Sequence, residues 1–266
     1  MKRRAILTIV LSVLVFCLTA SVSAGPIIDQ ILSKKELVVG TSATYPPLTF
    51  KTKGGVVAGF DMDLARAIAA AMDVPLRVEV IPFDELIPAL EKGRIDMIIS
   101  SMTITAERNL RIAFVGPYFI SGQSILTTKT AAMDINSPSD VNMPGFRIAV
   151  PRGTTTEIIA KNILPKADRV PAASTGDALK MLLDGKVKAM MADFPYVTVE
   201  AIRYRDKGLV SNAPFTSEPL GIAIRPNDPL MVNFLENLLG TMRGNGMLNA
   251  ATQRWFKESD WMADLP

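Results

Sequence analysis

The segment Ile95-Asp96-Met97-Ile98-Ile99-Ser100-Ser101-Met102-Thr103-Ile104-Thr105 decides how this chain folds. Its first five residues form a mostly apolar run rich in isoleucine, which predicts a short buried strand. The residues before it, 84–92, favour a helix that stops at Gly93, since glycine is the usual residue just beyond a helix. Directly after the strand, hydroxyl side chains replace apolar ones. A helix followed by a buried strand with a polar end is typical of a parallel α/β sheet.

Strand and helix patterns alternate on both sides of this segment. The predicted strands cover residues 37–40, 76–80, 95–99, 147–150 and 187–192. The predicted helices cover residues 62–72 (preceded by Asp61), 84–92, 177–184, 228–243 and 246–256, with a further helix starting after Gly153. Trp255 and Phe256 are expected to anchor the core. Strands separated by helices of about ten residues indicate βαβ units and parallel sheets.

The chain contains this pattern twice. When Gly93 is aligned with Gly185, a helix, a glycine and a buried strand coincide in both halves, and Ser101 falls opposite Asp193. The sequence therefore predicts two α/β lobes of similar construction, although the identity between the halves is too low to indicate a repeat.

The N-terminus has the features of a secretory signal peptide. Lys2, Arg3 and Arg4 precede an apolar run that ends in Val22-Ser23-Ala24, so cleavage is expected after Ala24. The alternative is that residues 5–24 remain as a membrane anchor, because the run is about long enough to span a bilayer. Cleavage would leave 26 basic against 26 acidic residues, and this neutrality argues against nucleic-acid binding.

The composition of the 266 residues excludes several kinds of site. With 48% hydrophobic and 21% charged residues, the chain is an ordinary folded protein. It has no histidine, which rules out Ser-His-Asp and Cys-His catalysis and histidine-ligated metals. Its one cysteine, Cys17, lies in the predicted signal peptide. No metal site and no cofactor are expected.

Polar residues gather where the predicted strands end, which is where open α/β sheets bind ligands. In the first half these are Ser100, Ser101, Thr103 and Thr105, followed by Arg108; in the second half they are Asp193 and the run Gly153-Thr154-Thr155-Thr156 before a helix. The arginine fork suits a carboxylate, and the aspartate suits an ammonium group. Together they indicate a clamp for a zwitterion. The alternatives are that Thr105 and the threonine run only cap helices and that Arg108 is solvated.

The ordered motifs of the chain resemble those of the bacterial extracellular solute-binding proteins of family 3, which serve polar amino-acid ABC transporters. The resemblance covers residues 37–256 and rests on Gly40-Thr41-Ser42-Ala43-Thr44-Tyr45-Pro46-Pro47, Gly59-Phe60-Asp61-Met62-Asp63-Leu64, Leu86-Ile87-Pro88-Ala89-Leu90, Asp96 to Thr105, Glu107-Arg108, Pro117-Tyr118-Phe119, Ser121-Gly122-Gln123, Gly153-Thr154-Thr155, Ala192-Asp193 and Gly221-Ile222-Ala223-Ile224.

This resemblance implies the two-lobe periplasmic-binding-protein-like fold of type II, in which two crossing strands form the hinge. The implied division is a signal peptide at 1–24, lobe 1 at 25–120 plus 218–266, and lobe 2 at 121–217, with Gly122 and Gly221 at the crossings. The implied function is capture of an amino acid and its delivery to the permease of an ABC importer. The protein would be periplasmic, monomeric and without enzymatic activity.

The resemblance also implies roles for ten residues. Arg108 corresponds to the residue that holds the ligand α-carboxylate, and Thr103 and Thr155 to residues that add hydrogen bonds through backbone or hydroxyl. Ser101 and Asp193 correspond to acceptors for the α-ammonium. The remaining positions form the pocket wall, with aromatic rings at Tyr45 and Phe83 and hydroxyls at Ser42, Thr154 and Thr156. Because Ser42 stands where binders of basic amino acids often carry aspartate, a neutral or acidic side chain is expected.

Two other functions remain open at this point. Some relatives are enzymes of the cyclohexadienyl dehydratase kind, which need a general acid; Glu157 and Glu218 are the candidates if they face the cleft. Their alternative roles are a helix-dipole partner and a hinge residue. An extracytoplasmic sensor module is the other possibility, and the lack of a second membrane span before Pro266 disfavours it.

Overall fold

The computed structural model describes residues 25–133, 135 and 138–266. The predicted signal peptide and its alternative, an N-terminal anchor, lie outside the described residues. Within the described residues, none of the helices has the length and apolar character needed to cross a membrane.

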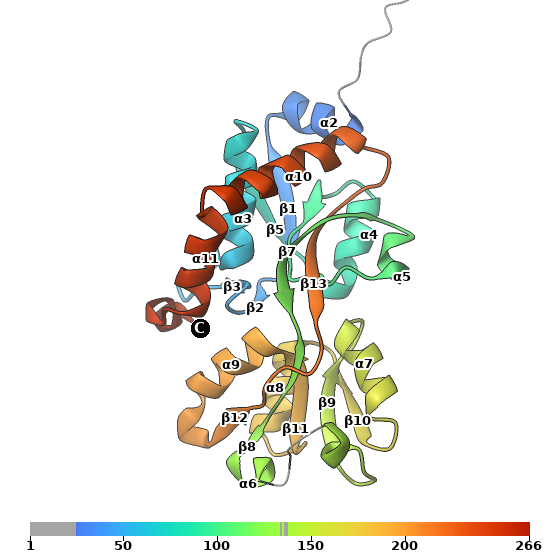
Figure 1. Cartoon of the computed structure of the whole chain (residues 1–266), viewed down its shortest axis with the longest axis vertical. Coiled ribbons are helices and arrows are strands. Elements are labelled where there is room, and N and C mark those ends of the chain that lie inside the picture. Colours follow the sequence, from blue (N-terminus) through green and yellow to red (C-terminus); the bar gives the residue numbers. More distant parts are fainter. Residues whose placement is uncertain (1–24, 134, 136–137) are drawn as a thin grey trace, which may run out of the picture.

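The first lobe is built on a five-stranded sheet in the order β5-β1-β6-β13-β7 (Figure 1). Its strands are β1 (Leu37–Thr41), β5 (Leu76–Val80), β6 (Met97–Ile98), β7 (Ala113–Ser121) and β13 (Glu218–Ile224). Its helices are α2 (Pro26–Lys34), α3 (Phe60–Ala71), α4 (Leu86–Glu91), α5 (Ala106–Asn109), α10 (Pro229–Gly244) and α11 (Met247–Phe256). A small sheet of β2 (Thr44–Tyr45), β3 (Thr49–Lys51) and β4 (Val57–Ala58) and the 3₁₀ turns Phe83–Glu85 and Asp260–Asp264 complete it. The β5-β1-β6 part is parallel, as the alternating pattern predicts.

The second lobe is built on another five-stranded sheet, in the order β10-β9-β11-β8-β12. Its strands are β8 (Gln123–Thr128), β9 (Arg147–Pro151), β10 (Asp168–Ala172), β11 (Ala189–Asp193) and β12 (Leu209–Ser211). Its helices are α6 (Lys129–Ala132), α7 (Thr155–Ile163), α8 (Thr175–Leu183) and α9 (Phe194–Arg203), with 3₁₀ turns at Pro138–Val141 and Arg205–Lys207. Strands β10, β9 and β11 are parallel, whereas β8 and β12 are antiparallel additions. The predicted α/β fold with two lobes is confirmed.

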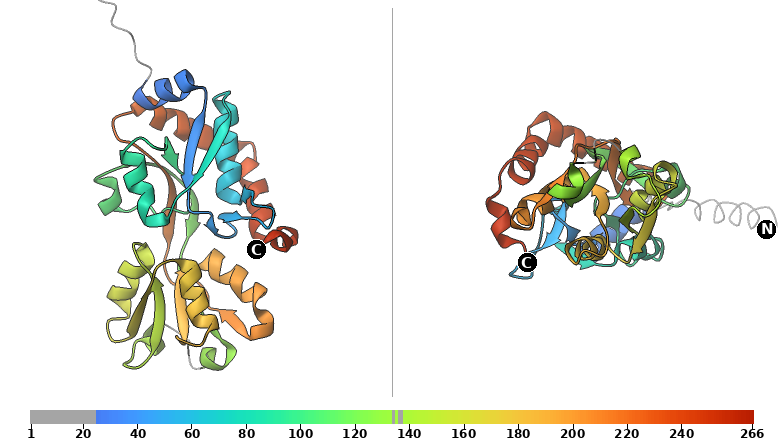
Figure 2. Two further views of the ribbon diagram at one scale, coloured as in Figure 1. Left: turned by 180° about the vertical axis from the view of Figure 1, so that it is seen from behind. Right: turned by 90° about the horizontal axis from the view of Figure 1, so that it is seen from below.

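Two long strands, β7 and β13, run between the lobes and pair with each other from Ala113 to Ser121 (Figures 1 and 2). Gly122, directly after β7, and Gly221, within β13, are glycines for a packing reason. A Cβ on Gly122 would lie 2.2 Å from the carbonyl oxygen of Thr216, and one on Gly221 would lie 2.7 Å from the side chain of Ile104. Both positions therefore need glycine because other atoms approach the backbone closely.

The core of the first lobe contains the predicted aromatic anchors. Trp255 is buried, and its indole N–H donates to Asp63 at 2.7 Å. Phe256 is half-buried and stacks on Phe119 with ring centroids 4.6 Å apart. Both rings fix α11 against α3 and β7, so the C-terminal helices close this lobe.

The first predicted helix starts earlier in the structure than expected. Asp61 was expected to precede a helix that starts at residue 62, but α3 begins two residues earlier, at Phe60, and Gly59 occupies the N-cap position. The Asp61 side chain is fully buried and accepts a hydrogen bond from Ser101. A tertiary contact, not helix capping, therefore determines where this carboxylate lies.

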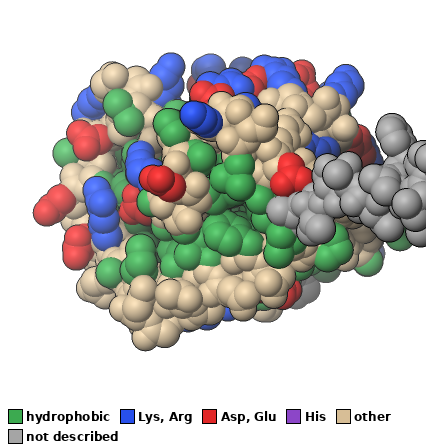
Figure 3. Space-filling model, turned by 90° about the horizontal axis from the view of Figure 1, so that it is seen from above, with side chains coloured by type: hydrophobic (Ala, Val, Ile, Leu, Met, Phe, Trp, Pro, Cys, Tyr) green, Lys and Arg blue, Asp and Glu red, His purple; other side chains and the backbone are tan. Residues whose placement is uncertain are grey.

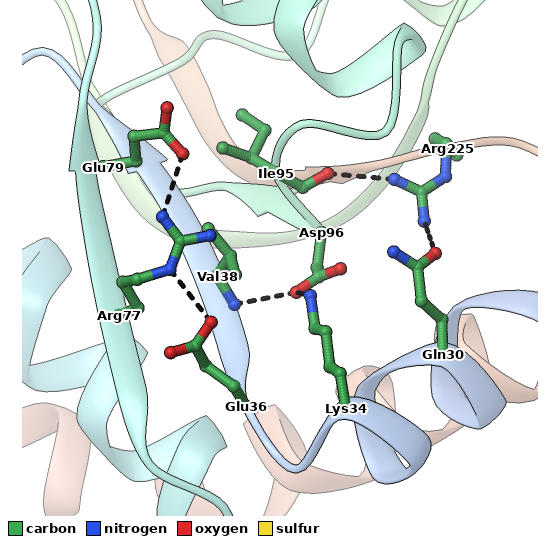
Figure 4. A network of polar contacts seen from close by, with 9 residues as sticks. All are labelled: Gln30, Lys34, Glu36, Val38, Arg77, Glu79, Ile95, Asp96 and Arg225. Atoms are coloured by element: carbon green, nitrogen blue, oxygen red, sulfur yellow. Dashed lines mark hydrogen bonds and ion pairs between the residues drawn. The ribbon is translucent and has the colours of Figure 1, made fainter.

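A polar network ties α2 to the amino end of the first sheet (Figure 4). The buried carboxylate of Asp96 pairs with Lys34 and accepts from the N–H of Val38 at 2.7 Å. Arg225 donates to the carbonyl of Ile95 and to Gln30. Seen from above, the end of the first lobe has an apolar area among charged side chains (Figure 3). Because the network lies at the amino ends of β1 and β6, it braces the sheet at the end opposite to the one where ligands bind.

Candidate functional site

A cavity of about 360 Å³ lies between the two lobes, at the carboxyl ends of β1, β6, β9 and β11. All ten residues predicted from the sequence line it. They are Ser42, Tyr45, Phe83, Ser101, Thr103, Arg108, Thr154, Thr155, Thr156 and Asp193. The other lining residues are Thr44, Val80, Ile81, Pro82, Asp84, Ser100, Pro151, Arg152, Ala173, Ser174 and Thr175.

Arg108 enters the cavity from the short helix α5. Thr105 caps this helix, as predicted, because its hydroxyl accepts from the Arg108 N–H at 3.2 Å. The guanidinium donates through Nη1 to the carbonyl of Thr103 at 2.9 Å and lies over the Phe83 ring, 5.5 Å from its centroid. Burial lowers the pKa of Arg108 from its usual value. The side chain stays a cation all the same, because arginine is not deprotonated in proteins. A guanidinium has five N–H donors, so it keeps donors for an anion after this contact.

Asp193 lies at the end of β11, in the second lobe. Gln123 donates its side-chain amide to Asp193 Oδ1, and the Gln123 oxygen accepts from Thr156 at 2.8 Å. The Thr156 hydroxyl therefore orients the glutamine that holds Asp193. Burial, reinforced by the charge of Glu218, raises the pKa of Asp193 to about 7. An arriving ammonium group would supply the positive charge that favours ionisation of this carboxyl.

Ser101 takes an uncommon backbone conformation, with φ of 53°. Asp61 supports it by accepting from the Ser101 N–H at 2.7 Å and from the Tyr118 hydroxyl at 3.0 Å. Burial raises the pKa of Asp61 to about 7. Asp61 was not predicted to belong to the site, although an aspartate on the apolar face of a helix is the signal that could have shown it.

The start of α7 brings three threonines to the cavity. The Thr154 hydroxyl caps the helix by accepting from the N–H of Glu157 and donates to the carbonyl of Pro151 at 2.8 Å. The Thr155 hydroxyl donates to Glu218 at 2.8 Å. The first N–H groups of a helix lack partners within the helix, so this end of α7 can receive an anion.

Tyr45 crosses from the first lobe to the second. Its ring stacks on Tyr196 with centroids 4.7 Å apart, and its hydroxyl accepts from the Asp193 N–H at 2.9 Å. The other predicted wall residue nearby, Ser42, is buried, and its N–H donates to the Ser100 hydroxyl at 2.9 Å. Tyr45 thus contributes to contact between the lobes as well as to the cavity wall.

Glu218 and Glu157, the two candidate acids, differ in position. Glu218 is 4% exposed and accepts from the hydroxyls of Thr103 and Thr155. Glu157 is half-buried, and its carboxylate accepts from the Gly153 N–H at 2.9 Å, which agrees with a role in the first turn of α7. Among the described residues, no group of three acidic, histidine or cysteine side chains is arranged to hold a metal ion.

Comparison with known proteins identifies the family. The profile of the bacterial extracellular solute-binding proteins, family 3, matches residues 37–258. The L-arginine-binding protein of Pseudomonas aeruginosa is 30% identical over 232 residues, which cover 84% of this chain and 88% of that protein. The ABC transporter arginine-binding protein 1 of Escherichia coli is 27% identical over 223 residues, with 82% and 90% covered.

Solved structures agree with this assignment. A putative binding component of an ABC transporter from Wolinella succinogenes, complexed with lysine, has a TM-score of 0.83 and 35% identity over 86% of this chain and 99% of that chain. An ancestral amino acid-binding protein, described as a precursor of cyclohexadienyl dehydratase, has a TM-score of 0.80 and 38% identity, with 86% and 99% covered. With the fold, the cavity between its lobes and these matches in agreement, the chain belongs to the bacterial extracellular solute-binding proteins, family 3.

Proposed function

We propose that this protein captures an amino acid between its lobes and delivers it to the permease subunits of an ABC importer. The observation that carries the proposal is that Arg108 and Asp193, one residue from each lobe, line the same cavity. A guanidinium and a carboxylate facing a common space match the α-carboxylate and α-ammonium of a free amino acid. The relatives named for arginine and lysine support the same class of ligand.

The wall around the ligand side chain combines features of two specificities. Ser42 provides no charge for a distal cation, which supports the expected neutral or acidic side chain. Asp84, which is exposed, also lines the cavity, as does Arg152 of the second lobe. Its carboxylate supports a basic amino acid, in line with the arginine-binding relatives, and both classes therefore belong in the test.

The test is a thermal-shift and calorimetric screen of the twenty common amino acids and L-cystine against refolded protein. Refolding matters because a copurified amino acid would mask an added one. We expect one or a few amino acids to raise the melting temperature and to bind with a single site. If none of them binds, the proposed function is wrong.

We further propose that the protein binds its ligand without converting it. Glu218 accepts hydrogen bonds from three threonine hydroxyls, which suits an ionised acceptor more than a proton donor. Glu157 does not line the cavity between the lobes. Release of phenylalanine or phenylpyruvate from an arogenate-like substrate would contradict this and favour the dehydratase.

The family is extracellular, and we propose that residues 1–24 direct export to the periplasm and are then removed. The exported protein is expected to begin at Gly25, because Val22-Ser23-Ala24 has the small residues that signal peptidase sites require. Intact-mass spectrometry of protein recovered from the producing cells checks this. A mass that includes residues 1–24 would support the membrane anchor instead.

We also propose the division of the chain that the resemblance implies, with lobe 1 at 25–120 plus 218–266 and lobe 2 at 121–217. The positions of Ser121 at the end of β7 and of Glu218 at the start of β13 support these boundaries. The protein is proposed to act as a monomer, since one chain supplies both sides of the cavity.

A further inference from the structure

Glu218 is a charged residue beside the cavity whose role the amino-acid clamp does not explain. It is the first residue of β13 and pairs with Ser121, the last residue of β7, so it lies where both connecting strands pass between the lobes. Only 4% of its surface is exposed. A carboxylate buried to this extent needs hydrogen-bond donors, because losing hydration is costly for a charge.

Three threonine hydroxyls supply those donors, and they come from different parts of the molecule. Thr103 of the first lobe and Thr155 of the second lobe donate to Oε2, at 3.1 and 2.8 Å. Thr216, two residues before Glu218, donates to Oε1 at 3.2 Å. One carboxylate at the hinge therefore holds a residue from each lobe.

These bonds differ in what lobe opening would do to them. Thr103 forms a β-bridge with Leu220, and Thr216 is close to Glu218 in the chain, so both stay near the carboxylate when the lobes separate. Thr155 is the first residue of α7 and moves with the second lobe. Its bond to Glu218 therefore depends on closure.

The same bonds determine where the hydroxyl protons point. A threonine hydroxyl has one proton, and in Thr103 and Thr155 it is directed to Glu218. Toward the cavity these two oxygens can then only accept. A ligand carboxylate would take its hydrogen bonds from the Arg108 guanidinium and from backbone N–H groups at the start of α7. The sequence left open whether these threonines act through backbone or hydroxyl, and this geometry favours the backbone.

We infer that Glu218 is a closure latch, a positioning residue that holds the lobes together through Thr155 without touching the ligand. The inference rests on the proposed function only in taking the ligand to be an amino acid. The latch itself consists of protein groups alone. The charged and titratable groups that face Glu218 are Arg108, Asp193 and Tyr45. Closure thus brings a hinge carboxylate, a lobe hydroxyl and the ligand clamp into one network.

The experiment measures the distance between the lobes without ligand. Spin labels are placed on the exposed residues Lys92 and Lys161 through cysteine substitutions in the chain that starts at Gly25, which contains no other cysteine. We expect the parent to have a closed population. Thr155→Val removes the bond to Glu218 and a 3.4 Å contact with the Thr103 hydroxyl, both of which cross the cleft, and leaves the bond between Tyr45 and Asp193 in place. It should lower the ratio of closed to open molecules about tenfold, because hydrogen bonds to charged groups are strong. Thr216→Val removes a bond to the same carboxylate and the acceptor of the Gln123 N–H, neither of which crosses the cleft, and should leave the ratio nearly unchanged.

A second variant tests whether the charge of Glu218 matters in addition to the size of its side chain. Glu218→Gln keeps the size of the side chain but removes its charge, and this charge helps to raise the pKa of Asp193. The pH below which L-arginine or L-glutamine binding weakens should therefore fall in Glu218→Gln and stay constant in Thr155→Val. Circular dichroism verifies that each variant folds.

Three results would overturn the latch: no closed population in the parent, equal effects of Thr155→Val and Thr216→Val, or a pH profile that Glu218→Gln leaves unchanged. Failure of the proposed function looks different. In that case no amino acid binds, while Thr155→Val still opens the lobes.

Discussion

Arg108→Ala is expected to weaken amino-acid binding by at least about thirtyfold. Removing one partner of a buried charge pair typically costs roughly 2–5 kcal/mol, and about 1.4 kcal/mol corresponds to a tenfold change in affinity. Arg108→Lys should lose nearly as much, because an ammonium cannot reproduce the fork that grips both carboxylate oxygens. Isothermal calorimetry with the amino acid found in the screen measures both variants.

Arg111 is the matched control, because it is three residues further along but belongs to a different environment. Its guanidinium is exposed and donates to both oxygens of Glu91, at 2.8 and 2.6 Å. An exposed ion pair contributes little to stability. Arg111→Ala should therefore bind like the parent protein. If Arg108→Ala also binds like the parent, the proposed clamp is wrong.

The affinity is expected to fall about fiftyfold between pH 7 and pH 5 for an amino acid that does not titrate in this range. Burial, followed by the charge of Glu218, raises the pKa of Asp193 to about 7. The ammonium of the ligand needs the ionised carboxylate, so below pH 7 each pH unit costs about a factor of ten. Above pH 7 the affinity should level off. Calorimetry across the range measures the profile, and its buffer dependence reports the proton released on binding.

Asp193→Asn is the control for this profile, since an amide does not titrate. Its binding should be weak at every pH and independent of pH between 5 and 8. The raised pKa of Asp193 affects the stability of the folded protein in the opposite direction to the binding affinity. Because the folded-state pKa of Asp193 lies above its unfolded value, the stability it contributes is complete below about pH 4 and is lost as the pH rises through 7. An affinity that rises on acidification would exclude Asp193 as the ammonium acceptor.

The sequence by itself determined the class of the fold and the residues around the cavity. Helix patterns that stop at Gly93 and Gly185, each followed by a buried strand, were sufficient to predict two α/β lobes. Polar residues at the carboxyl ends of those strands could be predicted to lie together, because parallel strands end at the same edge of a sheet and ligands bind there. The roles assigned to individual residues came from the family resemblance, and they stay predictions until the variants are measured.

Only the tertiary structure decided how the polar groups of the site are supported. Asp61 contacts Ser101, 40 residues away, and Glu218 contacts Thr103, 115 residues away. The sequence does not indicate the distant partner of either carboxylate, and charged residues are usually solvated. Hydrogen bonds between distant segments leave no periodic pattern, since one acceptor and one donor satisfy each other wherever the fold places them. The direction of a threonine hydroxyl is therefore determined by the assembled lobes, whereas the strand that carries the threonine is determined locally.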